Sequence, residues 1–184
     1  ENAEFAEVCR RCRLTFIGPS PEAMRAWGDK VRGRENAVRF GLPLLPGSQV
    51  LRDATHAVAE AKRVGYPVIL KASGGGGGRG MRIVRHERDL SDAFHAATRE
   101  AAIGFKNPDV YLERFVERPR HVEFQVLVDR HGQARCLGER ECSLQRRHQK
   151  VVEESPSPWM TPEVRAEMSA RIERAMLETG YEGL

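Results

Sequence analysis

The feature that most constrains this chain is a run of six glycines, from Gly74 to Gly80, which only Arg79 interrupts. Each glycine costs backbone entropy on folding, so a folded domain keeps such a run only where side chains must be absent. The usual reason is that backbone amides approach a bulky anion, whose charge nearby cations neutralise. Lys71 precedes the run and Arg79 lies within it, as such cations would. The run therefore predicts a phosphate-binding loop.

The sequence on each side of the run indicates which kind of loop it forms. It is not a P-loop, because no G-x-x-x-x-G-K-[ST] occurs. A dinucleotide-binding loop would open a helix at once, whereas the β-favouring stretch 81–84 follows here and the apolar run 68–70 precedes. We therefore expect a flap that joins two antiparallel strands and folds over its ligand, as the glycine-rich loop of protein kinases does. The alternative is a functionless linker, although linkers rarely lie between two apolar strands.

Composition excludes several classes of protein. With 40% hydrophobic and 30% charged residues the chain resembles an ordinary soluble protein, and it has no apolar run of bilayer length and no signal-peptide pattern. A net charge of +4 permits an anionic ligand but is weak support for nucleic acid. The four cysteines include Cys9 and Cys12 but no second C-x-x-C pair, so we expect reduced thiols. These features predict a cytoplasmic protein that binds neither membrane nor nucleic acid.

Residue periodicity predicts a mixture of helices and paired strands. The stretch 121–128 alternates with period two, which places His121, Glu123 and Gln125 on one face of a strand. Strands in consecutive pairs indicate an α+β fold rather than a doubly wound sheet. The predicted helices cover 3–13, 20–28, 29–41, 53–63, 87–103 and 161–180, and the predicted strands cover 14–17, 68–70, 81–84, 110–116, 121–128 and 134–139.

Three polar clusters could carry chemistry in addition to the loop. Lys30 stands in the first turn of a predicted helix, where a solvated surface lysine is the alternative. The polar face of 121–128 could equally be the solvent side of its strand. The segment 139–150 mixes both signs of charge with Gln and His, which suits a site for several anionic groups, although charge runs usually form solvated faces.

Several segments, in this order, match one family. They are Phe16–Pro19, Gly28–Lys30, Lys71–Ser73 with the glycine run, Pro119–Glu123, and Glu139–Glu154. Together they resemble biotin carboxylase, the ATP-grasp component of acetyl-CoA, propionyl-CoA and pyruvate carboxylases. The resemblance covers essentially all 184 residues, and Gln145–Lys150 is its most specific part.

The resemblance implies a truncated ATP-grasp fold. It divides the chain into the tail of an N-terminal domain (1–28), a connecting helix (29–46), the lid subdomain (47–118), and the first half of the second ATP-grasp subdomain (119–184). The chain begins inside a predicted helix and stops just after another ends, so we expect a fragment of a larger protein.

The resemblance also assigns roles to residues. Lys30 and Lys71 would hold the ATP phosphates, and the amides of Gly77 and Gly78 would close over them. Lys150 would place bicarbonate, so Lys71 and Lys150 are the predicted catalytic residues. The remaining predicted nucleotide contacts are the adenine-reading strand edge, Glu113, Arg114, Phe115 and Val116, and then His121, Gln145 and His148.

The implied cofactors and partners follow the same family. They are ATP, Mg²⁺ or Mn²⁺, bicarbonate, and biotin on a carrier, with a carboxyltransferase as partner, a homodimer in the full-length protein, and a role in fatty acid metabolism. The metal ligands are expected downstream of this chain, so the isolated chain should be inactive. Two alternatives remain: another ATP-grasp ligase such as the carbamoyl phosphate synthetase large subunit, against which the segment 146–150 argues, and a non-catalytic nucleotide-binding module.

Overall fold

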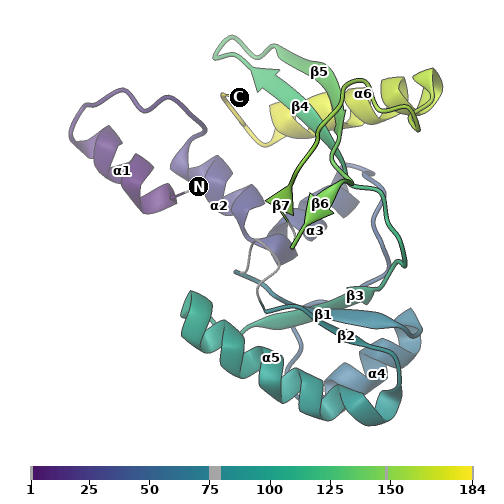
Figure 1. Cartoon of the computed structure of the whole chain (residues 1–184). Helices are drawn as coiled ribbons and strands as arrows, with labels where there is room; N and C mark the ends of the chain where they lie inside the picture. Colours follow the sequence, from purple (N-terminus) through teal and green to yellow (C-terminus); the bar gives the residue numbers. More distant parts are fainter. Residues whose placement is uncertain (1, 75–79, 148, 184) are drawn as a thin grey trace. The chain divides into compact units, whose positions relative to one another are not determined.

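The computed structural model describes residues 2–74, 80–147 and 149–183, and it separates the chain into two compact units. Unit 1 comprises Glu1–Pro43 and Arg120–Leu184, and unit 2 comprises Leu44–Pro119 (Figure 1). The two units have separate hydrophobic cores. The assignment of the four predicted segments to parts of a larger enzyme stays a prediction.

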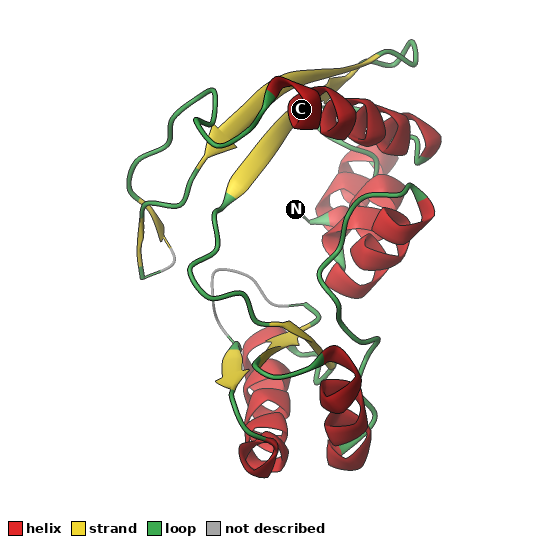
Figure 2. Cartoon of the chain, turned by 90° about the vertical axis from the view of Figure 1, so that its right-hand side faces the viewer, coloured by secondary structure: helices red, strands yellow, loops and turns green. Residues whose placement is uncertain are grey.

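Unit 2 is a three-stranded antiparallel sheet in the order β2-β1-β3. Strand β1 (Val68–Ala72) pairs with β2 (Arg82–Val84) on one side and with β3 (Val110–Arg114) on the other. Helices α4 (Ala54–Val64) and α5 (Leu90–Phe105) pack against each other and against this sheet (Figure 2), and the short 3₁₀ helix η1 (Glu87–Asp89) leads into α5. The predicted arrangement of two antiparallel strands around the glycine run is therefore confirmed.

The core of unit 2 follows the two expected periodicities. Alternate residues of β1 are buried, so Val68, Leu70 and Ala72 face the helices. The predicted stripe of α5 is buried in the same cluster and consists of Leu90, Phe94, Ala97 and Ala101. Lys71 consequently lies on the opposite face of the sheet from this core.

Unit 1 combines helices with two antiparallel hairpins. Its helices are α1 (Ala3–Arg11), α2 (Pro21–Gly28), α3 (Lys30–Arg39) and α6 (Pro162–Glu178), and its strands are β4 (Val122–Val128), β5 (Ala134–Glu141), β6 (Gln145–Arg146) and β7 (Gln149–Lys150). Helix α6 packs on the β4–β5 hairpin (Figure 1). The predicted caps are confirmed, since the side chains of Ser20, Asp29 and Thr161 accept hydrogen bonds from the first turns of α2, α3 and α6.

Two sequence-based assignments differ from the structure. The predicted strand 14–17 is irregular and pairs with no strand among the described residues, and Ile17 is 96% exposed. An apolar run becomes a strand only where a neighbouring strand satisfies its backbone. Conversely, the β6–β7 hairpin was not predicted, because its polar residues carry no strand periodicity.

None of the helices in the described part of the chain has both the length and the apolar character that crossing a membrane requires.

Leu70 offers a test of the unit 2 core. Its side chain is fully buried, so Leu70→Ala should lower the free energy of unfolding by about 2–5 kcal/mol. Ile83 on β2 is 49% exposed and serves as the control, because Ile83→Ala should cost about 1 kcal/mol or less. Chemical denaturation measures both, and equal losses would contradict the assigned orientation of the sheet.

Candidate functional site

In unit 2, Lys71 stands at the end of β1 just before the glycine run, and its ammonium forms an ion pair with Glu113 of β3. The register pairs Ile69 with Glu113, so Lys71 and Glu113 are diagonal neighbours on the same face of the sheet. The Glu113 side chain is 10% exposed and that of Lys71 is 26% exposed. A lysine held in this way presents a fixed positive charge at the start of the predicted phosphate loop.

The other residues of the predicted adenine-reading edge follow Glu113. The amide of Arg114 donates to the carbonyl of Pro46 at 2.8 Å, and the amide of Phe115 donates to the carbonyl of Pro67 at 2.9 Å. These two amides therefore already have backbone partners. Val116 is 37% exposed at the end of this segment. The role of this edge in reading adenine stays a prediction.

In unit 1, Glu123 of β4 is the centre of a charged cluster. Its carboxylate lies 2.6 Å from the Nζ of Lys150 and 3.1 Å from the Nη2 of Arg140. The Nε2 of His121 lies 3.2 Å from the other carboxylate oxygen. Glu153 joins the cluster, with its Oε2 3.3 Å from the Nε of Arg140 and 3.9 Å from Lys150. Two cations thus share two carboxylates on one face of the unit.

A β-bulge creates this cluster. The register pairs Val126 with Cys136, but Phe124 with Glu139, so one extra residue is accommodated on β5 between these pairs. Gly138 lies in that extra stretch with φ of 102°, a conformation that favours glycine. The shift places Arg140 directly opposite Glu123, and the guanidinium also donates to Gln125 at 2.9 Å.

The β6–β7 hairpin contributes the other predicted site residues of unit 1. Its register pairs Gln145 with Lys150. The side-chain amide of Gln145 lies 2.6 Å from the Nδ1 of His121 and donates to the carbonyl of Cys142 at 2.9 Å. The backbone of Cys142 in turn donates to the carbonyl of His121 at 2.7 Å. The structure therefore brings together His121, Gln145 and Lys150, which lie up to 29 positions apart in the sequence.

The remaining predicted residues are distributed elsewhere. Lys30 is the first residue of α3 in unit 1, half-buried beside the capping residue Asp29, whose carboxylate accepts from the amides of Val31 and Arg32. Gly77, Gly78 and His148 lie outside the residues that the structure describes. Their predicted contacts to the nucleotide stay predictions.

The electrostatics of the cluster favour its charged form. The hydrogen bond from Lys150, followed by that from Arg140, lowers the pKa of Glu123 despite the opposing effect of burial. The same bond to Glu123 raises the pKa of Lys150. Lys150 is therefore a full cation at neutral pH, and its ammonium has three donors, of which Glu123 occupies one.

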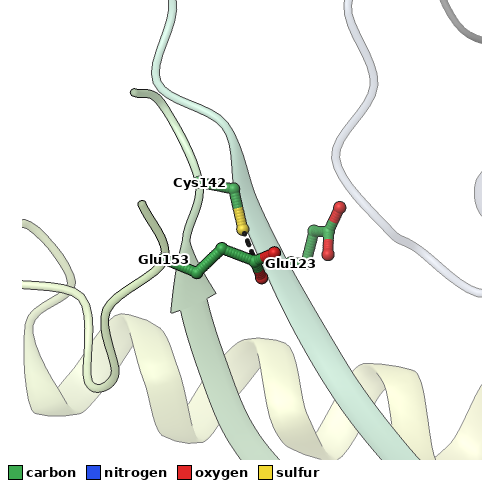
Figure 3. A group of neighbouring side chains, drawn as sticks. All are labelled: Glu123, Cys142 and Glu153. Atoms are coloured by element: carbon green, nitrogen blue, oxygen red, sulfur yellow. Dashed lines mark hydrogen bonds between the residues drawn. The ribbon is translucent and has the colours of Figure 1, made fainter. Parts of the chain in front are cut away.

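Three residues here, Glu123, Cys142 and Glu153, have ligand atoms within 4.8 Å of one another, as a metal site requires (Figure 3). However, Arg140 and Lys150 already neutralise both carboxylates, and the Cys142 thiol donates to Glu153 and has its pKa raised by burial. Mg²⁺ also prefers an all-oxygen set of ligands. The group does not fit magnesium, and we assign it none.

Sequence reasoning missed that Glu123, Arg140 and Glu153 hold the site together. Counting back from the turn at 129–132 without a bulge would have placed Glu123 opposite Glu139, a like-charged pair that sheets disfavour. The glycine at position 138 was the signal that could have corrected the register.

Comparison with known proteins assigns a family to this arrangement. The family model described as "Carbamoyl-phosphate synthase L chain, ATP binding domain" matches residues 29–184. The chain belongs to this family. The match includes β1 and β3 of unit 2 and the Glu123 cluster of unit 1, so the predicted site residues all lie inside the ATP-binding domain.

Among members of this ATP-binding family, the chain is similar to biotin carboxylases. Those of Haemophilus influenzae and Pseudomonas aeruginosa are each 51% identical to it, over all of this chain and 41% of each relative. The biotin carboxylase β-γ-ATP complex of Campylobacter jejuni is 44% identical, with a TM-score of 0.95 over 99% of this chain and 41% of that one.

A second solved structure supports the same likeness. The biotin carboxylase domain dimer of Hydrogenobacter thermophilus 2-oxoglutarate carboxylase, in complex with MgADP, ADP and bicarbonate, is 46% identical, with a TM-score of 0.95 over 98% of this chain and 40% of that one. The chain thus spans about two fifths of the length of these relatives. The resemblance to biotin carboxylase and the α+β ATP-grasp fold are confirmed.

The ion pair between Glu123 and Lys150 generates a pH prediction. Glu123→Gln should lower the pKa of Lys150 toward its ordinary value, because a neutral amide no longer stabilises the ammonium. In the unsubstituted chain, the ion pair that raises the pKa of Lys150 also stabilises the fold. This contribution to the free energy of unfolding is fully present at pH values below the ordinary lysine pKa. That contribution is lost as pH rises through the folded-state pKa. For Glu123 the contribution is present above the ordinary glutamate pKa and is lost as pH falls through the lowered one.

Titration of the Lys150 Cε resonance by NMR measures this effect. Glu60→Gln, which removes the partner of Arg63 on α4, is the matched control and should leave the Lys150 titration unchanged. An identical Lys150 pKa in both variants would refute the ion pair.

Proposed function

We propose that this chain is the ATP-binding part of a biotin carboxylase. The longer protein would carboxylate biotin on a carrier, using ATP and bicarbonate, through carboxyphosphate. The observation that carries this proposal is the Lys150 cation, fixed by Glu123 beside the linked pair His121–Gln145. Because the chain spans about two fifths of its relatives, the complete reaction would require segments beyond it.

The proposed chemistry is phosphoryl transfer followed by carboxylation. An oxygen of bicarbonate attacks the γ-phosphorus of ATP, and the bond to the β-phosphate oxygen breaks, giving ADP and carboxyphosphate. Carboxyphosphate then releases phosphate and CO₂, and N1 of biotin attacks that CO₂ and loses its proton to the released phosphate. Negative charge moves among oxygens throughout, so pre-positioned cations and amides supply most of the stabilisation.

Three lysines of this chain have proposed parts in that reaction. Lys150 would orient bicarbonate through its ammonium donors, since Glu123 holds the side chain in place. Lys71, held by Glu113, and Lys30, at the start of α3, would bind the ATP phosphates. His121, Gln145 and His148 and the edge Glu113–Val116 would contact the rest of the nucleotide.

The glycine run would cover the reacting groups and keep water away from them. Carboxyphosphate hydrolyses readily, so water must be excluded while it exists, and a closing flap achieves this. The strand–loop–strand arrangement of β1 and β2 supports such a flap. The amides of Gly77 and Gly78 would close over the phosphates.

The relatives support the proposed cofactors. The Campylobacter jejuni protein is a complex with β-γ-ATP, and that of Hydrogenobacter thermophilus contains MgADP and bicarbonate and is a dimer. For this protein we propose ATP, Mg²⁺ or Mn²⁺, bicarbonate and carrier-bound biotin. The proposed partners are a biotin carboxyl carrier, a carboxyltransferase and, in the full-length protein, a second copy. The proposed setting is cytoplasmic acyl-CoA carboxylation for fatty acid metabolism.

The isolated chain provides one test. It should show no bicarbonate-dependent ATP hydrolysis and no carboxylation of free biotin, because the one candidate metal group among its described residues is already neutralised by Arg140 and Lys150. Phosphate release with and without bicarbonate measures this. Measurable turnover would contradict the proposal that the metal ligands lie in another segment.

Lys71 provides a second test, in the longer protein that carries this segment. Lys71→Ala should weaken ATP binding or turnover about tenfold or more, as expected for a lost charge-assisted contact. Lys62, an exposed lysine of α4 paired with Glu87, is the matched control, and Lys62→Ala should leave both quantities unchanged. Equal kinetics in the two variants would show that Lys71 does not bind the ATP phosphates.

A further inference from the structure

Behind the Glu123 cluster, one serine hydroxyl links two separate segments of unit 1. The Oγ of Ser157 donates to the Oε2 of Glu141 at 3.2 Å, and Ser157 is only 3% exposed. Glu141 ends β5, whereas Ser157 lies in the loop before α6. Neither residue has a role in the function proposed above.

From Glu141 the hydrogen bonds lead directly to the proposed nucleotide residues. The other carboxylate oxygen of Glu141 accepts from the amide of Ser143 at 3.2 Å. The Oγ of Ser143 accepts from the amide of His121 at 2.8 Å. The ring of His121 is linked to Gln145 at 2.6 Å. A continuous chain therefore joins Ser157 to His121 and Gln145.

The backbone of Ser157 is anchored independently of this hydroxyl. Its amide donates to Glu139 at 3.1 Å. The Glu139 carboxylate, whose side chain is 0% exposed, also accepts hydrogen bonds from the Nε and Nη2 of Arg165 on α6 at 2.6–3.0 Å. Replacing the hydroxyl by hydrogen therefore leaves the loop attached to the core. Positioning can be separated from folding at this residue.

We propose that Ser157 is a positioning residue of the nucleotide site, which acts through Glu141 and Ser143 to fix His121 and Gln145. This inference rests on the proposed function of those two residues. The Glu141 carboxylate holds two donors, Ser157 Oγ and the Ser143 amide, that belong to different loops. The backbone of Glu141 stays paired with Val122 and Glu154 whatever its side chain does. When the Ser157 donor is lost, however, the carboxylate can rotate, and the Ser143 amide loses an acceptor in a fixed position.

The test begins with this chain in the absence of nucleotide. In Ser157→Ala, the side-chain amide signals of Gln145 should shift in ¹⁵N NMR spectra and exchange with water faster than in the unsubstituted chain. The matched control is Ser155→Ala, because Ser155 is exposed and its hydroxyl has no hydrogen bond within the described part of the chain. Thermal unfolding of both variants checks that the fold is retained. Unchanged Gln145 signals in Ser157→Ala would overturn the proposal.

The second measurement uses the longer enzyme. Ser157→Ala should raise the KM for ATP about threefold to tenfold, the size expected for one hydrogen bond, with a smaller change in kcat. Ser143→Ala should have a similar effect, and the double variant should be less than additive, because both residues belong to one chain of contacts. Full additivity would show independent effects and would refute the proposed path.

His121→Ala separates failure of this inference from failure of the proposed function. If His121→Ala raises the KM for ATP and Ser157→Ala does not, the positioning role is wrong and the nucleotide role of His121 stands. If neither variant raises the KM for ATP, the proposed function of this site is wrong, and the positioning role of Ser157 is wrong as well.

Discussion

The site in unit 1 depends on one irregularity, the bulge that Gly138 introduces into β5. Without it, Glu123 would face Glu139 across the hairpin. With it, Glu123 faces Arg140, and two opposite charges replace two like charges. A Cβ atom at position 138 would meet no atom within 4 Å, so the positive φ rather than a lack of space for a Cβ favours glycine there. The electrostatics of the cluster thus follow from one backbone conformation.

The same shift gives two neighbouring residues of β5, Glu139 and Arg140, different roles. Glu139 is fully buried and joins Arg165 of α6 to the loop at Ser157, so it connects the hairpin to the helix behind it. Arg140 lies on the other side and organises Glu123, Gln125 and Glu153. A buried charge is stable only when it is fully paired, and Glu139 meets that condition through the two-nitrogen contact with Arg165 and the Ser157 amide. One strand therefore supports the fold with one face and the proposed chemistry with the other.

Most helices of this fold could be predicted because local signals specify them. Ser20, Asp29, Asp53 and Thr161 mark helix starts through hydrogen bonds within the first turn, which need no tertiary partner. The stretch 14–17 was mispredicted as a strand because an apolar run is compatible with several environments. The polar hairpin at 145–150 was missed because its strands consist of two residues each and have no apolar face.

The sequence by itself determined which functional groups are present and in which order they occur. They are a glycine run between two strands, lysines before and after that run, and a polar segment with His and Gln that is typical of biotin carboxylase. Those properties depend on residue identity and order, which a sequence states directly. Only the tertiary structure decided which groups meet. The pairings of Lys71 with Glu113, Lys150 with Glu123, and Ser157 with Glu141 join residues 16 to 42 positions apart. Lys71 and Glu113 meet through the register of β1 and β3, whereas Lys150 and Ser157 reach β4 and β5 from the β6–β7 hairpin and from the loop before α6. Contacts of this kind depend on how distant segments pack, which residue order alone does not state.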